Sequence, residues 1–288
     1  MAMQHRGSGG PRGEYVISPP KGLLAINWAE LWRFRDLFLT LAWRDIAVRY
    51  KQAVLGIAWA LIQPLSTMII FTFIFNRMAK IESGDATPYP VFLYVGMIIW
   101  QYYSGTITNA SNSMITNAQL IQKVYFPRLI VPATAATTGL VDFVLASVVL
   151  VGLMAWYGFV PCLAGLLVLP VLIVITILSA MGVGLFMAAL NIKYRDVRYA
   201  LPFCVQLLMY VTPVIYPVAM LDKYPVAKAL MRWLNPMAAV ITNARAGLFG
   251  RSAMDPVALV IALGMSLVLF AVGLCYFRNT ERYFADVA

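Results

Sequence analysis

The sequence has few charged residues for its length. Only 12% of its 288 residues are Asp, Glu, Lys or Arg, whereas 61% are hydrophobic. A soluble domain carries about 25% charged residues, so this composition excludes an ordinary soluble domain. It predicts an all-α protein that crosses a membrane several times, because membrane-spanning segments must be apolar.

Histidine is scarce and nucleotide-binding motifs are missing. The single histidine, His5, lies close to the amino terminus, which excludes histidine-based metal sites and acid–base pairs elsewhere in the chain. The phosphate-binding pattern G-x-x-x-x-G-K-[ST] is missing, and no lysine follows a glycine. The chain therefore cannot hold ATP in the P-loop manner. We expect no enzyme active site, no metal and no cofactor in it.

Cysteine is also rare. The three cysteines, Cys162, Cys204 and Cys275, are an odd number and lie in separate apolar stretches. This pattern argues against a disulfide framework and predicts buried, unreactive thiols.

The positive charge follows a membrane pattern. The formal net charge is +10, but the basic residues flank apolar runs instead of gathering on one face, so nucleic acid is excluded as a partner. Residues 1–27 contain no long apolar core. They predict a disordered cytoplasmic tail and not a secretory signal.

Six apolar runs approach the roughly 20 residues that a membrane-spanning helix needs. They lie at about 54–79, 91–115, 131–156, 160–190, 200–219 and 256–277. Six spans put both termini on one side, and a cytoplasmic placement leaves 15 Lys and Arg residues inside against 7 outside. That asymmetry matches the positive-inside rule. The second cytoplasmic loop then contains Lys193, Arg195, Asp196 and Arg198.

Residues 28–52 predict an amphipathic interface helix. At helical spacing Trp28, Trp32 and Trp43 fall on one apolar side, as expected for a helix lying in the headgroup region of the cytoplasmic leaflet. Its basic residues, which we expect near lipid phosphate, are Arg33, Arg44, Arg49 and Lys51. The alternative is a packing helix that faces the soluble side.

Residues 53–288 predict the six-span transmembrane domain, and within it 220–255 differ from a plain loop. The segment is apolar, but Arg232, Pro236 and Arg245 interrupt it before any stretch reaches span length. Short apolar pieces of this kind predict a re-entrant helical hairpin that enters from the outer face.

Asp142 is a carboxylate deep inside a predicted span. An ionisable group at this depth is costly and is a functional candidate, for example a proton relay. No second Asp, Glu or His lies at a comparable depth, so a structural, hydrogen-bonded carboxylate is favoured. The relay interpretation stays open as the basis of a proton-coupled carrier.

Polar and small residues recur at helical spacing in two spans. Gln101, Ser104, Thr108 and Asn112 indicate either close helix packing or a watery passage. The stripe of Ala180, Gly184 and Ala188 favours close helix packing.

Aromatic residues of the spans are candidates for a substrate pathway as well as for membrane-interface anchors. They are Trp100, Tyr102, Tyr103, Tyr210 and Tyr216.

Four motifs carry a resemblance to a known family. They are "WRDIAVRYKQAVLGIAWALIQP" (43–64), "NAQLIQKVYFPRLIVP" (117–132), "NIKYRDVRYALPFCVQLLMYVTPVIYP" (191–217) and "LNPMAAVI" (234–241). In this order they resemble the membrane subunit of polysaccharide and polyol-phosphate ABC exporters. The likeness runs from about residue 28 to the carboxy terminus.

The resemblance implies a homodimer of six-span subunits in the bacterial inner membrane. Two copies of a separate cytoplasmic ATPase would bind ATP and Mg²⁺. The first cytoplasmic loop would be the coupling helix that contacts this ATPase, with aromatic and arginine anchors of the kind enriched at interface hot spots. Its residues are Gln122, Lys123, Tyr125, Phe126 and Arg128.

The expected cargo is a lipid-linked polysaccharide. The long basic amino-terminal helix and the aromatic-rich spans are most similar to the O-antigen branch of the family. Teichoic acid or capsule export is the alternative within the family, and the proton-coupled carrier is the alternative outside it.

Overall fold

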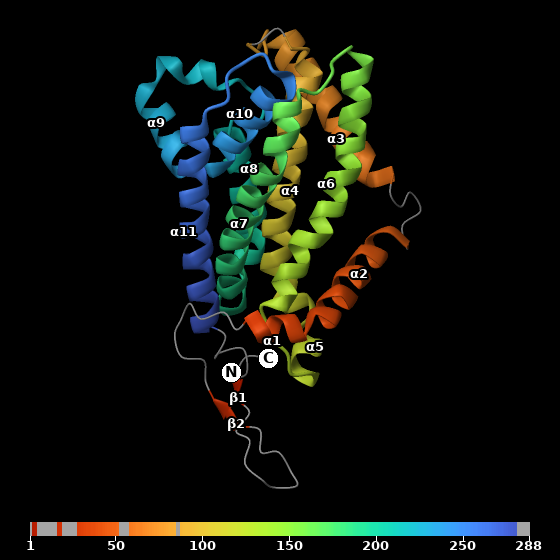
Figure 1. Cartoon of the computed structure of the whole chain (residues 1–288), viewed down its shortest axis with the longest axis vertical. Helices are drawn as coiled ribbons and strands as arrows, with labels where there is room; N and C mark the ends of the chain where they lie inside the picture. Colours follow the sequence, from red (N-terminus) through yellow and green to blue (C-terminus); the bar gives the residue numbers. More distant parts are fainter. Residues whose placement is uncertain (1, 5–15, 19–27, 52–57, 85–86, 281–288) are drawn as a thin grey trace.

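The computed structural model describes residues 2–4, 16–18, 28–51, 58–84 and 87–280, and almost all of them are helical (Figure 1). The elements are β1 (Ala2–Gln4), β2 (Val16–Ser18), α1 (Trp28–Arg33), α2 (Arg35–Lys51), α3 (Ala58–Phe71), the π-helix η1 (Thr72–Met78), α4 (Tyr89–Thr116), α5 (Ala118–Lys123), α6 (Ile130–Trp156), α7 (Leu163–Lys193), α8 (Val197–Val211), the 3₁₀-helix η2 (Val218–Lys223), α9 (Pro225–Leu234), α10 (Pro236–Phe249) and α11 (Pro256–Thr280).

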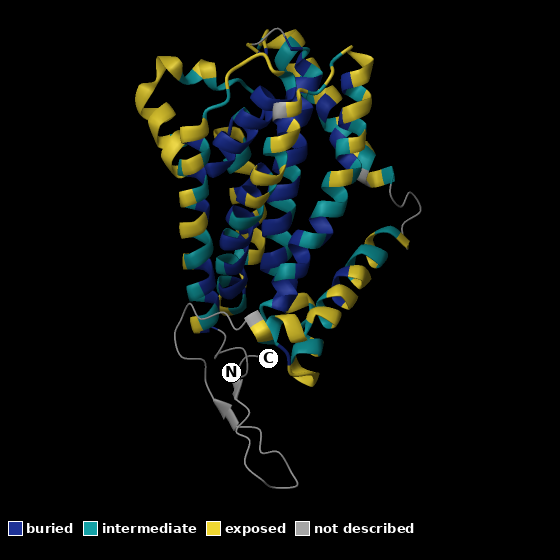
Figure 2. Ribbon diagram, in the orientation of Figure 1, coloured by how far each residue is buried: buried dark blue, intermediate teal, exposed yellow. Residues whose placement is uncertain are grey.

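A bundle of long helices forms the centre of the chain. The helix α7 packs against α4, α10 and α11, and α4 packs against α6. Figure 2 shows that the buried residues gather on α4, α7 and α10, whereas α9 and much of α2 are exposed. The apolar residues of these helices therefore lie in two places, in the core of the bundle and on its outer surface.

Glycines allow the central helices to approach closely. A Cβ on Gly273 of α11 would lie 2.0 Å from the carbonyl oxygen of Gly182 in α7, and a Cβ on Gly165 of α7 would lie 2.3 Å from Gly247 of α10. The predicted small-residue stripe has the same function: Gly184 faces Ala110 of α4, where a Cβ would be only 2.8 Å away. The close-packing interpretation of that stripe is confirmed.

Several helices are apolar and long enough to cross a membrane. Among the described residues, four helices meet both criteria: Leu61–Met78, Ile130–Trp156, Gly165–Lys193 and Pro256–Thr280. The helix α4 has 28 residues but includes hydroxyl and amide side chains, and α8 has 15 residues. These helices agree with the predicted polytopic membrane protein, while the count of six depends on α4 and α8.

The two ends of the bundle differ. The helices α1 and α5 and the carboxyl end of α11 lie at the lower end in Figure 1, and α9 and α10 lie at the upper end. The α7–α8 connection belongs to the lower end, because Asn191 in the last turn of α7 donates to the carbonyl of Ser111 in the last turns of α4. The two predicted cytoplasmic loops therefore lie at the same end of the bundle.

The helices α9 and α10 form a hairpin around Asn235 and Pro236. The Asn235 side chain accepts a hydrogen bond from the Met237 amide (3.1 Å) and so caps α10. The helix α10 is buried in the bundle, whereas α9 is exposed and ion-paired at its polar side through Arg232 and Asp255 (2.9 Å).

The predicted interface helix is divided into α1 and α2, and it has two apolar sides. Trp32 and Trp43 are about 70% exposed, while Leu41 and Ala42 are buried against the bundle. Ala42 directly precedes Trp43, yet it is buried where Trp43 is exposed. The structure separates them because α2 packs along α6 with one side and leaves the other side uncovered.

The prediction of buried cysteines is wrong, because none of the three is buried. Cys162 and Cys204 are exposed, and Cys275 is intermediate. Cys162 precedes α7 at the end of the bundle and Cys204 is on the outer side of α8, so an apolar neighbourhood in the sequence did not mean burial in the core.

Little of the amino-terminal tail is described. Ala2–Gln4 pairs with Val16–Ser18 in an antiparallel ribbon, and the rest of the tail that was predicted to be disordered lies outside the described residues. The same is true of residue 52 of the predicted interface helix and of the first residues of the predicted first span.

We expect Gly273→Ala to destabilise the bundle, because its methyl group would meet the Gly182 carbonyl at 2.0 Å and overpacking costs about 1–3 kcal/mol or more. Gly264→Ala is the matched control in the same helix, since nothing lies within 4 Å of the added Cβ. The measurement is thermal unfolding of the purified protein in detergent. Equal stability of the two variants would contradict the close α7–α11 contact.

A second prediction concerns orientation. With Cys162, Cys204 and Cys275 replaced, single cysteines at the exposed positions Glu82 and Asp222 should react with an impermeant thiol reagent added outside intact cells. A cysteine at Arg195 should react only after the membrane is opened, because we expect the α7–α8 connection to be cytoplasmic. The reverse labelling pattern would overturn the orientation.

Candidate functional site

The candidate site is residues 118–128, which contain α5; we call this segment the coupling loop after the role that the resemblance implies. The helix α4 ends at Asn117, whose amide donates to the Ser113 carbonyl (3.0 Å), and α5 begins with Leu120 and Ile121 donating to the Asn117 carbonyl. The chain leaves the helix at Val124, which has extended backbone. Pro127 follows and keeps the preceding residue out of the helical region.

The coupling loop presents polar side chains and one aromatic ring at its surface. Gln122 and Lys123 are exposed, and Tyr125 is 56% exposed. Arg128 is half-buried. These side chains lie at the end of the bundle where the sequence predicted a partner.

Phe126 is buried, although the resemblance implied that both aromatic side chains of the loop contact the ATPase. It is only 5% exposed and belongs to a buried cluster with Leu41 of α2, Ile130 of α6 and Phe277 of α11. Consecutive side chains of an extended segment point to opposite sides, so Tyr125 points out where Phe126 points in. Phe126 anchors the loop to its own chain and is not a contact for a partner.

The second loop extends the charged surface at this end. Lys193, Arg195, Asp196 and Arg198 are exposed. The Lys193 ammonium lies 5.4 Å from the centre of the Tyr194 ring, a cation–π distance. The sequence predicted these residues as a cytoplasmic loop, and the structure places them at the same end as the coupling loop.

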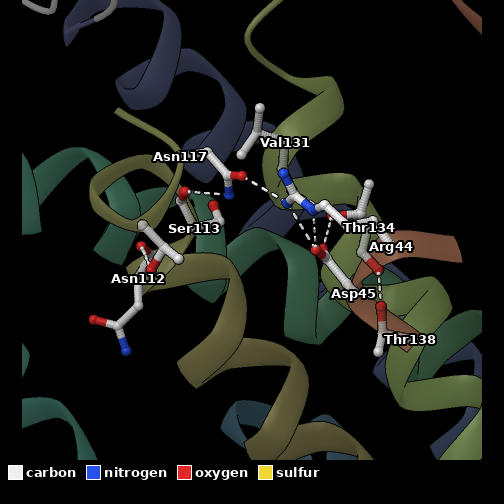
Figure 3. Close-up of polar contacts among 9 residues, drawn as sticks. Arg44, Asp45, Asn112, Ser113, Asn117, Val131, Thr134 and Thr138 are labelled. Atoms are coloured by element: carbon white, nitrogen blue, oxygen red, sulfur yellow. Dashed lines mark hydrogen bonds and ion pairs between the residues drawn. The ribbon is translucent and has the colours of Figure 1, made fainter. Parts of the chain in front are cut away.

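Arg44 and Arg49 of α2 bond to other segments of the protein, which the sequence did not predict. Figure 3 shows Arg44 between Asp45 and Asn117, with Nη2 of Arg44 2.7 Å from Oδ1 of each. Asp45 also accepts from the Thr134 hydroxyl of α6 (3.3 Å). Arg44 was expected near lipid phosphate, whereas here it joins α2 to the base of α5. Arg33 and Lys51 remain exposed.

Asp142 is held by the carboxyl-terminal end of α2. Its two carboxylate oxygens accept from Nη1 of Arg49 and from the Tyr50 hydroxyl. Burial, followed by this hydrogen bond, raises the pKa of Tyr50, so the phenol stays protonated and donates. The structural-carboxylate interpretation is supported, but its partners come from α2 and were not identifiable from residue spacing.

Three of the five proposed pathway aromatics are wrong. Trp100, Tyr102 and Tyr103 are at most 4% exposed and pack inside one chain. Tyr102, for example, faces Gly139 of α6, where a Cβ would lie 3.0 Å from the ring. Only Tyr210 is well exposed, and Tyr216 donates to the Val211 carbonyl (2.7 Å).

The polar residues of α4 also bond locally. Thr108 donates to the Ser104 carbonyl, and Asn112 donates to the Thr108 carbonyl while its own oxygen accepts from Asn191 of α7. This pattern agrees with the helix-packing interpretation for the lower half of α4. No cluster of three His, Cys, Asp or Glu suited to a metal lies among the described residues.

Arg245 is a structural residue whose partners the sequence analysis missed. It is buried in α10 and donates to the carbonyl oxygens of Phe92 (3.0 Å), Pro213 (2.8 Å) and Val214 (2.6 Å). Its guanidinium also lies 3.5 Å from the Phe92 ring centre. An arginine inside a short apolar helix was the available signal, because such charges are kept only where they are satisfied.

Several known proteins are similar in sequence to this chain over most of its length. An O-antigen export system permease protein, RfbA, from Klebsiella pneumoniae is 29% identical over 252 residues, covering 88% of this chain and 95% of the relative. The protein of the same name from Myxococcus xanthus is 26% identical, covering 89% and 97%. A polysialic acid transport protein, KpsM, from Escherichia coli is 23% identical, covering 83% and 91%.

The family match covers most of α2, the candidate coupling loop and α10. Residues 36–249 match the profile of the ABC-2 type transporter family, which is most of the described chain. The protein therefore belongs to the ABC-2 type transporter membrane family.

Proposed function

We propose that this chain is the transmembrane subunit of a bacterial exporter that moves a lipid-linked, O-antigen-like polysaccharide across the inner membrane. The observation that carries the proposal is the nearly full-length similarity to two O-antigen export permeases. Without a P-loop in this chain, ATP and Mg²⁺ belong to a separate subunit. Capsule export is the second candidate, favoured by the similarity to the polysialic acid transport protein. Teichoic acid export is the third.

Six spans are the proposed topology, with both termini cytoplasmic. The first span is α3 with η1, and the others are α4, α6, α7, α8 with the segment after it, and α11. The hydroxyl groups of α4 that bond to its own backbone lower the cost of placing them in lipid. The helices α1 and α2 form the interface helix, with Trp32 and Trp43 toward the headgroups, and α9 and α10 form the outer re-entrant hairpin.

A homodimer is proposed because two helices are poorly covered by the rest of the chain. Only Leu201 and Val205 of α8 are buried, and its exposed side includes Phe203, Leu207 and Tyr210. The surface of α3 is also largely exposed. A second copy that covers these surfaces would place Tyr210 near the passage between subunits.

The proposed contact for two cytoplasmic ATPase subunits is the exposed part of the coupling loop, Gln122, Lys123 and Tyr125. The loop at 193–198 provides further charge at the same end. A tyrosine with an exposed ring and hydroxyl is a residue type enriched at interface hot spots. The arrangement supports energy transfer from the cytoplasmic end of the bundle.

The proton-coupled carrier is less well supported. A carboxylate that relays protons must change partners and protonation state, whereas Asp142 is held by both Arg49 and Tyr50. Its paired geometry favours a structural contact between α2 and α6.

Tyr125→Ala should weaken binding of the ATPase subunit about thirtyfold, because a truncated aromatic hot spot costs about 2 kcal/mol. Tyr157→Ala, an exposed tyrosine at the other end of α6, is the matched control and should change nothing. Phe126→Ala should instead lower the stability of the chain, since Phe126 is in its core. Affinity is measured with the purified subunits. Unchanged binding of Tyr125→Ala would remove Tyr125 from the contact.

Substitutions of Asp142 distinguish the proposed exporter from the proton-coupled carrier. Asp142→Asn should retain most polymer export, because the amide still accepts from Tyr50. Asp142→Ala should lower the protein level through a loss of about 1 kcal/mol, since the ion pair is about a third exposed (37% and 34%). Surface polymer and membrane protein level are measured together. A stable Asp142→Asn protein without export, and transport that stops when the proton gradient is dissipated while ATP is maintained, would favour the carrier.

A further inference from the structure

Asn117 is shared by three helices. Its side-chain Nδ2 donates to the Ser113 carbonyl of α4 (2.9 Å), and its own carbonyl accepts the first amide bonds of α5, from Leu120 (3.0 Å) and Ile121 (3.1 Å). Its remaining side-chain acceptor, Oδ1, accepts from Arg44 of α2 at 2.7 Å. A displacement of the α4–α5 junction therefore acts directly on α2 (Figure 3).

Asp45 fixes the orientation of the Arg44 guanidinium that donates to Asn117. Its Nε and Nη2 atoms both contact Oδ1 of Asp45, at 3.0 and 2.7 Å. The other oxygen of Asp45 accepts from Thr134 of α6. A guanidinium presents several donors in a fixed plane, so one side chain can hold Asp45 and Asn117 at once. A lysine has no such fixed fork.

Apolar packing supports the same junction. Leu41 of α2 is buried in the cluster that includes Phe126, and Leu120 and Ile121 of α5 pack against this cluster. Leu41 of α2 and the inner side of α5 thus contribute to the same apolar cluster, while Gln119, Gln122 and Lys123 are exposed.

We propose that α2 and the coupling loop move as one body during transport, and that Arg44 is the positioning residue that joins them. The inference rests on the proposed function, since the movement begins with an ATPase that contacts the coupling loop. The far end of α2 is attached to α6 through Arg49 and Asp142. A displacement of the α4–α5 junction is therefore delivered to α6 as well as to α4.

The first experiment measures polymer exported per ATP hydrolysed by the assembled transporter in liposomes. Arg44→Gln and Asn117→Ala should each lower this ratio about tenfold, as expected for loss of a hydrogen bond to a charged group. Because the two residues act through one contact, the double variant should be no worse than either single variant. Arg35→Gln is the matched control, because Arg35 is exposed on the same helix and its contacts, with Asp36 and the Trp32 ring, are local.

The readout separates positioning from folding. Binding of the ATPase and the amount of assembled transporter should stay unchanged in all four variants. Additive losses in the double variant, or an unchanged export ratio in both single variants, would overturn the inference.

The second experiment tests movement as one body. In a chain with its native cysteines replaced, the pair Arg44→Cys and Asn117→Cys should export inefficiently until a short bifunctional thiol reagent links the two positions. Linking should then restore export, because the reagent replaces the lost contact. If linking fails to restore export or abolishes it, α2 and α5 must separate during the cycle, and the proposal is wrong.

The unmutated chain distinguishes this failure from failure of the proposed function. If it co-purifies with an ATPase and exports polymer while the linked pair does not, only the inference on Arg44 fails. If the unmutated chain binds no ATPase, the proposed function itself fails.

Discussion

The close contact between α7 and α11 at Gly182 and Gly273 is the constraint on which the rest of the bundle depends. In lipid there is little hydrophobic force to join apolar helices, so association depends on packing and on short backbone distances. The central helix α7 uses this device on three sides, toward α4, α10 and α11. A rigid centre of this kind fixes where every peripheral element can attach.

The peripheral elements attach through polar contacts. Arg245 holds α10 to a backbone carbonyl of α4 and to two carbonyls of the non-helical segment after α8, which lipid cannot satisfy. On the other end, Arg44, Arg49 and Asp142 hold α2 against the bundle. Each basic residue therefore satisfies groups that apolar packing leaves unpaired, and each joins segments that are distant in the sequence.

A closely packed centre with peripheral helices attached by polar contacts suits a transporter whose ATPase acts at one end of the bundle. The ATPase contact that we propose lies on a short helix whose inner side is packed and whose outer side is exposed. Asn117, the residue before this helix, is bonded to Arg44 of α2, and α2 is bonded to α6 through Arg49 and Asp142. Movement can then pass along the surface of the bundle while the glycine contacts keep its centre intact.

The sequence by itself determined that the chain is a membrane protein, which predicted loops are rich in Lys and Arg, and which family motifs it contains. These features could be read because composition and spacing do not depend on neighbours in space. The sequence also determined the close packing at Gly184, since small residues at helical spacing have few other uses in a membrane helix. The four described helices that are apolar and long enough to cross a membrane all correspond to runs located from the sequence, whereas α4 and α8 do not meet both criteria.

Only the tertiary structure decided which neighbour each side chain meets. Tyr125 and Phe126 are adjacent aromatic residues, yet one is exposed and the other buried, because the extended backbone at Val124 turns them in opposite directions. Trp100, Tyr102 and Tyr103 suited a sugar passage by type, but close helices cover them. Asp142 is bonded to residues that are 92 and 93 positions away in the sequence. The periodicity of a sequence indicates which residues share a face of a helix, but it does not indicate which other helix packs against that face.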